Sequence, residues 1–190
     1  PMENVWMKDG EIVGEIIEGA EDTPPVEGAI KQTLWPDHCV QNSPDSEFHP
    51  DLDIHDDDTV LQKGYDSKID SYSGFWDNGK QDQPRFDNGS TLAETLREIG
   101  INRVVLVGLA GDFCVGYHGL DALEEGFEVV VVKDATRSIA VPLGEGVTTE
   151  TLMDQQLKDA GALIVNSDEL DAVLQPQDPA AGSAPPTPGM

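Results

Sequence analysis

Apolar and polar positions are arranged differently in the two halves of the chain. After residue 90, short apolar runs alternate with segments of helical periodicity. Ser90 precedes the first of these helices as its expected cap, and glycines close the helices. The expected helices are 91–99, 114–125, 148–160 and 168–174, the last of them capped by Ser167. The expected strands are 59–63, 103–109, 127–132 and 162–166. Strands that are apolar on both faces predict an α/β fold, an open parallel sheet with helices on both faces.

The first ninety residues show less of this order. Residues 5–17 alternate around Asp9-Gly10, a pair that suits the tight turn of a hairpin. Residues 33–58 are irregular and rich in Pro, His and Asp. We therefore expect an acidic hairpin and linker segment (1–32), one α/β domain (33–174) and a disordered tail rich in Pro, Ala and Gly (175–190).

The composition is strongly acidic, and this excludes several classes of partner. Lys and Arg number 11 against 37 Asp and Glu, a formal net charge of −26. A field of that sign repels nucleic acid and anionic lipid. No apolar run approaches the roughly 18 residues of a membrane helix, and two cysteines do not make a disulfide framework. We expect a cytoplasmic protein whose partner is a small molecule.

The strongest chemical signal follows the apolar strand 103–109. Cys114 ends the stretch Val107-Gly-Leu-Ala-Gly-Asp-Phe-Cys114, where the chain turns from strand to helix. A helix N-terminus favours a thiolate, and its free N–H groups can hold the oxyanion of an acyl-transfer intermediate. The alternative is a buried structural cysteine, with Asp112 as the helix cap. The spacing alone leaves both interpretations open.

Other candidate residues carry weaker signals. Lys63 closes the expected strand 59–63, where it could stabilise a thiolate or simply reach solvent. His38 is either a solvated loop residue or a metal ligand. The acidic run 51–58 lacks the Gly and Glu spacing of a helix–loop–helix calcium site, which favours a solvated loop. His118, one turn into the expected helix, is most simply an ordinary surface or core residue.

Several short motifs, taken together, resemble those of one family. Their order along the chain is that of the nicotinamidases (pyrazinamidases), members of the isochorismatase-like hydrolase superfamily. The resemblance runs from about residue 33 to residue 166, and its Trp-Pro-x-His-Cys-Val block separates nicotinamidases from other members. The motifs are Trp35-Pro-Asp-His-Cys-Val-Gln41, Phe48-His-Pro50, Lys63-Gly64, Asp70-Ser-Tyr-Ser-Gly-Phe75, Gly108-Leu-Ala-Gly-Asp-Phe-Cys-Val115 and Asp134-Ala-Thr-Arg137.

This resemblance implies a reaction and its central residues. Nicotinamide would be hydrolysed to nicotinate and ammonia through a thioester on Cys114, with Lys63 as the lysine of the family's Asp-Lys-Cys triad. The family also implies a cis peptide bond between Leu109 and Ala110. That bond would turn the Ala110 N–H toward the oxyanion that the Cys114 N–H also faces.

The resemblance implies a substrate pocket as well. Trp35 would stand beside the pyridine ring, and Tyr72 would line the pocket. His38 would be one ligand of a divalent metal, usually zinc, which in the family holds the pyridine nitrogen.

Two parts of the family pattern have no counterpart in this sequence. The family's first strand carries the triad aspartate, and a following segment supplies the remaining metal ligands. The residues before Trp35 contain no histidine, and their acids sit in turn or linker patterns. Since the sequence also starts at Pro1, we expect an N-terminally truncated form with an incomplete metal site and little or no activity. The alternatives are a complete, non-catalytic binding protein and a hydrolase of another small amide.

The same gap predicts an open sheet edge. A central strand of the family would be missing beside 103–109, so we expect one edge of that strand to lack a backbone partner. Residues 59–63 are expected on the other side of the gap, and the 5–17 hairpin outside it. An open strand edge favours pairing with another chain, so we also expect that the protein can form a homo-oligomer.

Overall fold

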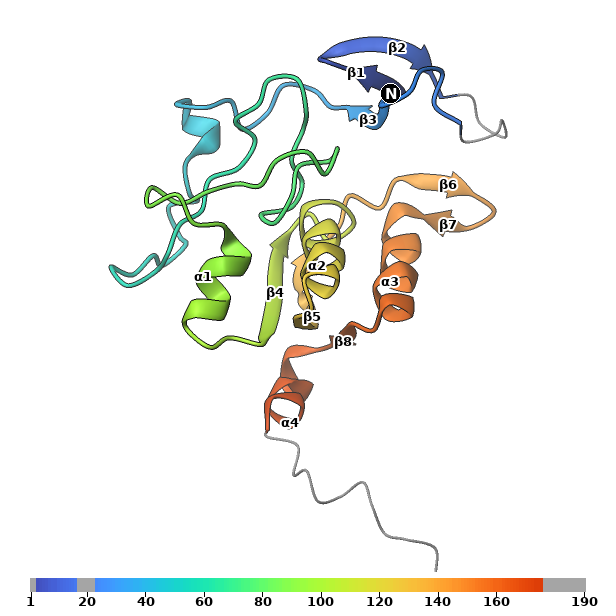
Figure 1. Cartoon of the computed structure of the whole chain (residues 1–190). Coiled ribbons are helices and arrows are strands. Elements are labelled where there is room, and N and C mark those ends of the chain that lie inside the picture. Colours follow the sequence, from blue (N-terminus) through green and yellow to red (C-terminus); the bar gives the residue numbers. More distant parts are fainter. Residues whose placement is uncertain (1–2, 17–22, 176–190) are drawn as a thin grey trace, which may run out of the picture.

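The computed structural model describes residues 3–16 and 23–175 and arranges their strands in three sheets (Figure 1). One of these sheets is parallel, with the order β4-β5-β8. Its strands are β4 (Arg103–Leu109), β5 (Glu128–Arg137) and β8 (Leu163–Val165), joined through α2 (Cys114–Glu124) and α3 (Thr149–Ala160). The expected α/β fold with a parallel sheet and helices is confirmed.

The helices begin where polar caps satisfy their first N–H groups. Thr91 caps α1 (Leu92–Glu98), because its side chain accepts from the Glu94 N–H while the Glu94 carboxylate accepts from the Thr91 N–H. The expected cap, Ser90, is therefore wrong by one residue. Thr148 caps α3 in the same reciprocal way with Thr151, and Gly161 ends that helix at φ 103°.

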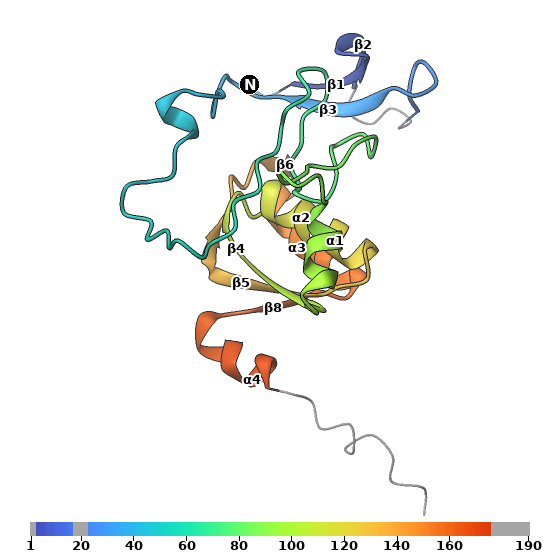
Figure 2. The same cartoon turned by 60° about the vertical axis from the view of Figure 1, so that its left-hand side comes forward.

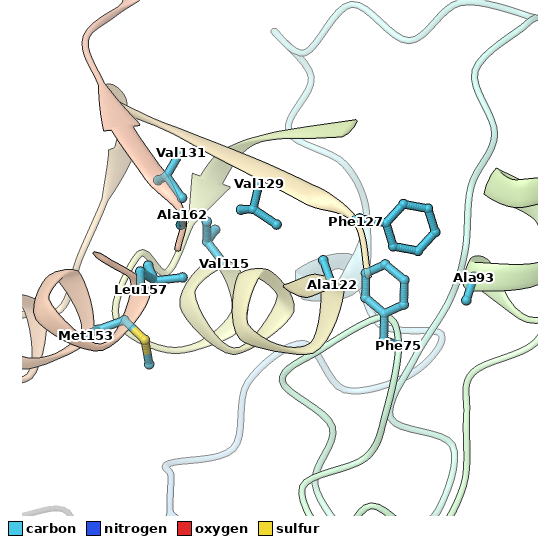
Figure 3. Close-up of a cluster of buried hydrophobic side chains, with 10 residues drawn as sticks. All are labelled: Phe75, Ala93, Val115, Ala122, Phe127, Val129, Val131, Met153, Leu157 and Ala162. Carbon is cyan, nitrogen blue, oxygen red and sulfur yellow. The ribbon is translucent and has the colours of Figure 1, made fainter. Parts of the chain in front are cut away.

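One hydrophobic core joins the helices to the sheet. Helices α1, α2 and α3 contribute to it from the same side, as the view in Figure 2 shows. At Gly119 of α2 an added Cβ would lie 2.8 Å from Leu157 and 3.2 Å from Leu106, so only glycine permits this close approach of helix to sheet. The buried side chains of the core are Phe75, Ala93, Val115, Ala122, Phe127, Val129, Val131, Met153, Leu157 and Ala162 (Figure 3).

Strand β4 forms the edge of the parallel sheet. It pairs with β5 alone, and no other described residue pairs with its second edge. The side chains that face away from the core are exposed, with Val107 at 57% and Leu109 at 73% of their accessible surface. The expectation of a half-paired strand is therefore confirmed for the described residues.

A separate antiparallel sheet forms near the N-terminus. Strands β1 (Glu3–Lys8) and β2 (Glu11–Glu15) make the expected hairpin, with Asp9 and Gly10 at positive φ in its turn. A third strand, β3 (Ile30–Leu34), pairs with β1 in the order β2-β1-β3 and was not expected. The hairpin stays in this sheet and does not fill the open edge of β4, as predicted. The division expected at residue 33 falls inside β3 and stays a prediction.

Other elements differ from the sequence-based expectations. Residues 59–63 form no strand, because no described strand lies beside them to complete a ladder. Ser167 lies inside the 3₁₀ turn η2 (Ser167–Glu169), ahead of α4 (Leu170–Leu174), so the expected cap is wrong and Asn166 takes that place. The elements not expected at all are η1 (Pro44–Ser46) and the short hairpin of β6 (Pro142–Gly144) and β7 (Val147–Thr148).

Two further points concern the rest of the chain. The expected tail lies outside the described residues from 176 onward. Within the described ranges, no helix has both the length and the apolar character that crossing a membrane requires.

Candidate active site

The turn between β4 and α2 is shaped by small residues. The Leu109–Ala110 peptide bond is cis, as the family resemblance implied, and Gly108 before it has φ 105°. Gly111 donates its N–H to the Arg137 carbonyl at 2.8 Å. A Cβ at Gly111 would lie 2.5 Å from the Ser138 hydroxyl, so glycine is required for the chain to pass so close to the end of β5.

Cys114 is the first residue of α2, at the carboxyl end of β4. The N–H groups of Phe113 and Val115 both donate to the Ala110 carbonyl, at 3.1 and 3.0 Å. In the described part of the chain, the N–H groups of Ala110 and Cys114 donate no hydrogen bond. These two donors beside a half-buried sulfur are the elements of an oxyanion hole.

Lys63 reaches this sulfur from the loop region, the mostly irregular segment 35–91 between β3 and α1. Its Nζ lies 3.8 Å from the Cys114 Sγ and donates to the Ser71 carbonyl at 2.5 Å. The structure therefore brings together the two residues that the sequence proposed as partners, although the expected strand before Lys63 is absent. A positive charge at this distance favours the thiolate form of a cysteine.

A pocket of about 370 Å³ opens beside the sulfur. It is bounded by the outer side chains of β4, by Leu61 and Lys63 across the open edge, and by Cys114 and His118 of α2. Its lining contains no aspartate or glutamate among the described residues. The pocket therefore offers a thiol and an ammonium group but, among the described residues, no carboxylate that could act as general base.

Aromatic side chains gather next to the pocket. Trp35 donates its indole N–H to the Tyr72 hydroxyl at 2.8 Å, and Tyr72 also lines the pocket. Burial raises the pKa of Tyr72 despite the hydrogen bonds from Trp35 and Thr33. Phe113 packs edge-on against Trp35, with ring centroids 4.7 Å apart. Sequence reasoning missed Phe113, although its position next to Cys114 was a signal.

His38 lies outside this pocket and is exposed. Its Nδ1 is 2.7 Å from the Pro36 carbonyl, so Nδ1 carries the proton and Nε2 keeps a free lone pair, the arrangement that a metal ligand requires. However, residues 3–16 and 23–175 contain no group of three His, Cys, Asp or Glu side chains that could hold a metal ion. The described residues therefore do not fit a zinc site.

His118 is a pocket residue that sequence reasoning did not select. It lies four residues after Cys114 on α2, and therefore on the same face of the helix. Its Nδ1 accepts the Gly74 N–H at 3.1 Å, and its ring packs on Phe75. Burial and then the charge of Lys63 lower the pKa of His118 to about 4, so the imidazole is neutral at pH 7.

Asp112 has a structural role rather than the capping role that the sequence suggested. The N-cap of α2 is Phe113, which makes no side-chain capping bond. The buried Asp112 carboxylate accepts instead from the N–H groups of Ile139 and Ala140 and from the Thr149 hydroxyl. Burial would raise the pKa of Asp112, but these donors outweigh it and hold the pKa below its usual value.

Comparison with known proteins gives a consistent set of relatives. The model of the isochorismatase domain matches residues 12–153. Nicotinamidase of Escherichia coli (strain K12) is 39% identical over 119 residues, which make up 63% of this chain and 53% of that protein. An Acinetobacter baumanii nicotinamidase/pyrazinamidase structure superposes with a TM-score of 0.65 at 32% identity, covering 88% of this chain and 76% of that chain.

A third relative concerns the metal. The pyrazinamidase of Pyrococcus horikoshii, solved in complex with zinc, has a TM-score of 0.55 at 33% identity, covering 70% of this chain and 63% of that chain. The chain spans about half the length of the curated nicotinamidases that it matches. Because the domain match covers most of the sequence and the similar proteins are nicotinamidases and pyrazinamidases, the chain belongs to the isochorismatase-domain family.

Proposed function

We propose that this chain carries the thiol site of a nicotinamidase-type amidohydrolase, with nicotinamide as its substrate. The observation that carries the proposal is the pairing of Cys114 with Lys63 at the start of α2, where the sulfur lies 3.8 Å from the ammonium nitrogen. The free N–H groups of Ala110 and Cys114 support it, as does the similarity to nicotinamidases.

The proposed reaction has two halves. The Cys114 sulfur attacks the carboxamide carbon, and the carbonyl electron pair moves to the oxygen, which the N–H groups of Ala110 and Cys114 stabilise. Reforming the carbonyl breaks the C–N bond, and ammonia leaves with the proton that the thiol gave up. Water then cleaves the thioester, which releases nicotinate and restores the thiol.

The proton transfer is the weak step in the described site. No carboxylate lines the pocket, and the absence of a general base commonly slows such a reaction by about 10²–10⁴-fold. We therefore propose that this chain alone turns nicotinamide over slowly or not at all. Ammonia release from nicotinamide measures this directly, with Cys114→Ala as the blank. Rapid, Cys114-dependent release would show that another group carries the proton.

The nucleophile can be tested without turnover. Pyridine-3-carbaldehyde should add to Cys114, because the sulfur forms a bond to the aldehyde carbon while the thiol proton ends on the former carbonyl oxygen. We expect the aldehyde to protect Cys114, but not Cys39, from iodoacetamide, as measured by peptide mapping. Lys63→Met should weaken the protection. Equal protection of the two cysteines would overturn the assignment of the nucleophile.

A non-catalytic binding function is the second candidate. The pocket without an acidic side chain favours it, since such a pocket can hold a ligand without a base to process it. Aldehyde addition at Cys114 with no detectable ammonia release, even after long incubation, would support this candidate over catalysis.

A further inference from the structure

The Lys63 ammonium is held at its tip rather than through its backbone. Residues 59–63 form no strand, and in the described part of the chain no backbone hydrogen bond holds them. A lysine head group on a flexible four-carbon stem does not fix its own position. Its Nζ is fixed beside the Cys114 sulfur by the Ser71 carbonyl, to which it donates at 2.5 Å. The distance between nitrogen and sulfur therefore depends on where Ser71 lies.

Ser71 belongs to a short buried segment with internal hydrogen bonds. Residues 71–75 are all buried. The Ser71 hydroxyl donates to the Ser73 carbonyl at 3.0 Å, and the Ser73 hydroxyl accepts the Phe75 N–H at 3.0 Å. Because these bonds tie the segment together, an attachment at any one of its residues also fixes the Ser71 carbonyl.

His118 attaches this segment to the helix that carries Cys114. Its Nδ1 accepts the Gly74 N–H at 3.1 Å. An added Cβ at Gly74 would lie 3.2 Å from the Cε1 of the ring, so glycine allows the close approach. Nδ1 can accept only while it is unprotonated. Burial, followed by the charge of Lys63, lowers the pKa of His118 to about 4, so the acceptor is present at pH 7.

The position of this bond along α2 distinguishes it from the other attachments. Lys80 also ties the loop region to α2, but its partners Asp121 and Glu124 lie farther along the helix. His118 lies one turn after Cys114, on the same face. The hydrogen bond at His118 therefore acts close to the sulfur, where a small shift of the segment changes the site most.

Packing alone is the alternative explanation. The His118 ring lies against Phe75, with ring centroids 4.8 Å apart, and Phe75 is itself a core residue. A ring contact permits sliding, however, whereas a hydrogen bond is directional. The Gly74 N–H is also buried. Without an acceptor it would be left unpaired, which is unfavourable unless the segment moves to find another partner.

We propose that His118 is a positioning residue for the thiol site. By accepting the Gly74 N–H, its Nδ1 holds the Ser71 carbonyl in place. That carbonyl in turn keeps the Lys63 ammonium against the Cys114 sulfur. This role rests on the proposed function, because it deepens the pairing of thiol and ammonium, but it can be measured without turnover.

Two alkylating reagents of nearly equal size report the position of the ammonium. Iodoacetate carries a negative charge and iodoacetamide is neutral, so the ratio of their rates at Cys114 rises when a positive charge lies beside the sulfur. Peptide mapping of timed samples gives this charge-selectivity ratio, with the exposed Cys39 as the internal reference. Lys63→Met calibrates the full effect, and we expect it to lower the ratio about fivefold at low salt.

Variants of His118 separate positioning from packing. His118→Phe keeps a flat ring but has no acceptor, and it should lower the ratio at least about threefold, toward the value for Lys63→Met. His118→Asn places a carbonyl oxygen near the position of Nδ1 and should keep most of the ratio. Added to Lys63→Met, His118→Phe should lower the ratio no further, because its effect acts through the ammonium.

A control variant accounts for general loss of stability. Leu157→Val removes one methylene from a core residue that packs against Gly119, away from the buried segment, and should leave the ratio unchanged. Circular dichroism and the Cys39 rate report whether each variant is folded. If His118→Phe does not fold, His118→Leu takes its place, since leucine also has no acceptor.

Several outcomes would overturn the proposal. An unchanged ratio in the folded His118 variant without an acceptor would remove the residue from this role. An equal fall in His118→Asn or in Leu157→Val would show that packing is responsible. An unchanged ratio in Lys63→Met would show that the ammonium does not act at the sulfur. Failure of aldehyde addition with the expected ratios would refute the proposed function alone, and the reverse pattern would refute the positioning role alone.

Discussion

Residues 92–174 and residues 23–91 are ordered by different interactions. The later region contains the parallel strands and the helices, and only Phe75 among the ten core side chains comes from the earlier region. Between β3 and α1, the chain is ordered mainly by local hydrogen bonds, such as those from the N–H groups of Gln81 and Asp82 to Asp77. Cys114 comes from the first kind of structure and Lys63 from the second. The distance between Cys114 and Lys63 therefore depends on the contact between the two regions.

The largest expected effect comes from breaking that contact. Phe75 is 1% exposed, and its ring packs against Phe127 and His118. Phe75→Ala should lower the free energy of unfolding by about 3–5 kcal/mol, because it leaves a cavity where the loop region meets the core. Urea unfolding measures the loss. Phe48→Ala is the matched control, since Phe48 is 55% exposed and should change stability by less than about 0.5 kcal/mol.

A smaller effect is expected from the ion pair that ties the loop region to α2. Lys80 donates to the buried Asp121 and to the exposed Glu124. Lys80→Met leaves the Asp121 carboxylate without its partner and should cost about 1–3 kcal/mol at pH 7. Lys158→Met, at an exposed position of α3, is the control.

The pH dependence of this loss has a definite sign. Burial raises the pKa of Asp121 in the folded chain despite the bond from Lys80. A raised carboxyl pKa opposes folding once the group ionises, and the penalty disappears when Asp121 is protonated in both states. The difference between Lys80→Met and the parent should therefore shrink as the pH falls through the raised folded-state pKa of Asp121, which lies above the ordinary carboxyl value of about 4. A loss that stayed constant with pH would mean that packing, not charge, is responsible.

Each region contains one cysteine, so the rates at which the two thiols are alkylated compare the regions. Cys39 is exposed in a loop at φ 47°, whereas Cys114 is half-buried at a helix start beside Lys63. We expect iodoacetamide to label Cys114 about tenfold faster than Cys39, because its sulfur lies at a helix start 3.8 Å from the Lys63 ammonium nitrogen. Lys63→Met should reduce that ratio. Equal labelling, or faster labelling of Cys39, would show that access decides.

The smallest change in stability is expected at the open edge of β4. Val107→Lys places a charge on an exposed strand position and should alter the unfolding free energy by less than about 0.5 kcal/mol. It should also reduce concentration-dependent association, because charged edge strands resist pairing. Light scattering over a range of concentrations measures this. Val131→Lys, in the core of the same sheet, should instead destabilise the chain strongly.

The sequence predicted what local patterns determine. The long apolar runs of β4 and β5 were sufficient to predict the parallel sheet, and the glycine-rich turn was sufficient to place Cys114 at the start of a helix. Strand β3 was missed because its polar residues become a strand only through pairing with β1, far away in sequence. Residues 59–63 have strand-like composition, but composition cannot supply a neighbouring strand.

The candidate site shows the same division. Cys114 and Lys63 were recognisable from their motifs, and their approach to each other is seen in the structure. The setting of His118 was not predictable, because its Nδ1 accepts from the N–H of Gly74, which lies 44 residues earlier in the sequence. The capping role of Asp112, which the alternative interpretation of the Cys114 turn contained, is wrong, because its partners lie 27 to 37 residues later.

Asp112 also illustrates a trade-off between anchoring and chemistry. It is the acid nearest to Cys114 in sequence, yet its carboxylate already fastens three donors from the segment that leads into α3. Protonation of Asp112 would weaken these hydrogen bonds, and the same hydrogen bonds oppose protonation because they lower its pKa. One carboxylate cannot serve both as a structural hydrogen-bond acceptor and as a general base. An acid that transfers a proton to or from this cysteine must therefore be one whose carboxylate is not already holding the fold together through hydrogen bonds.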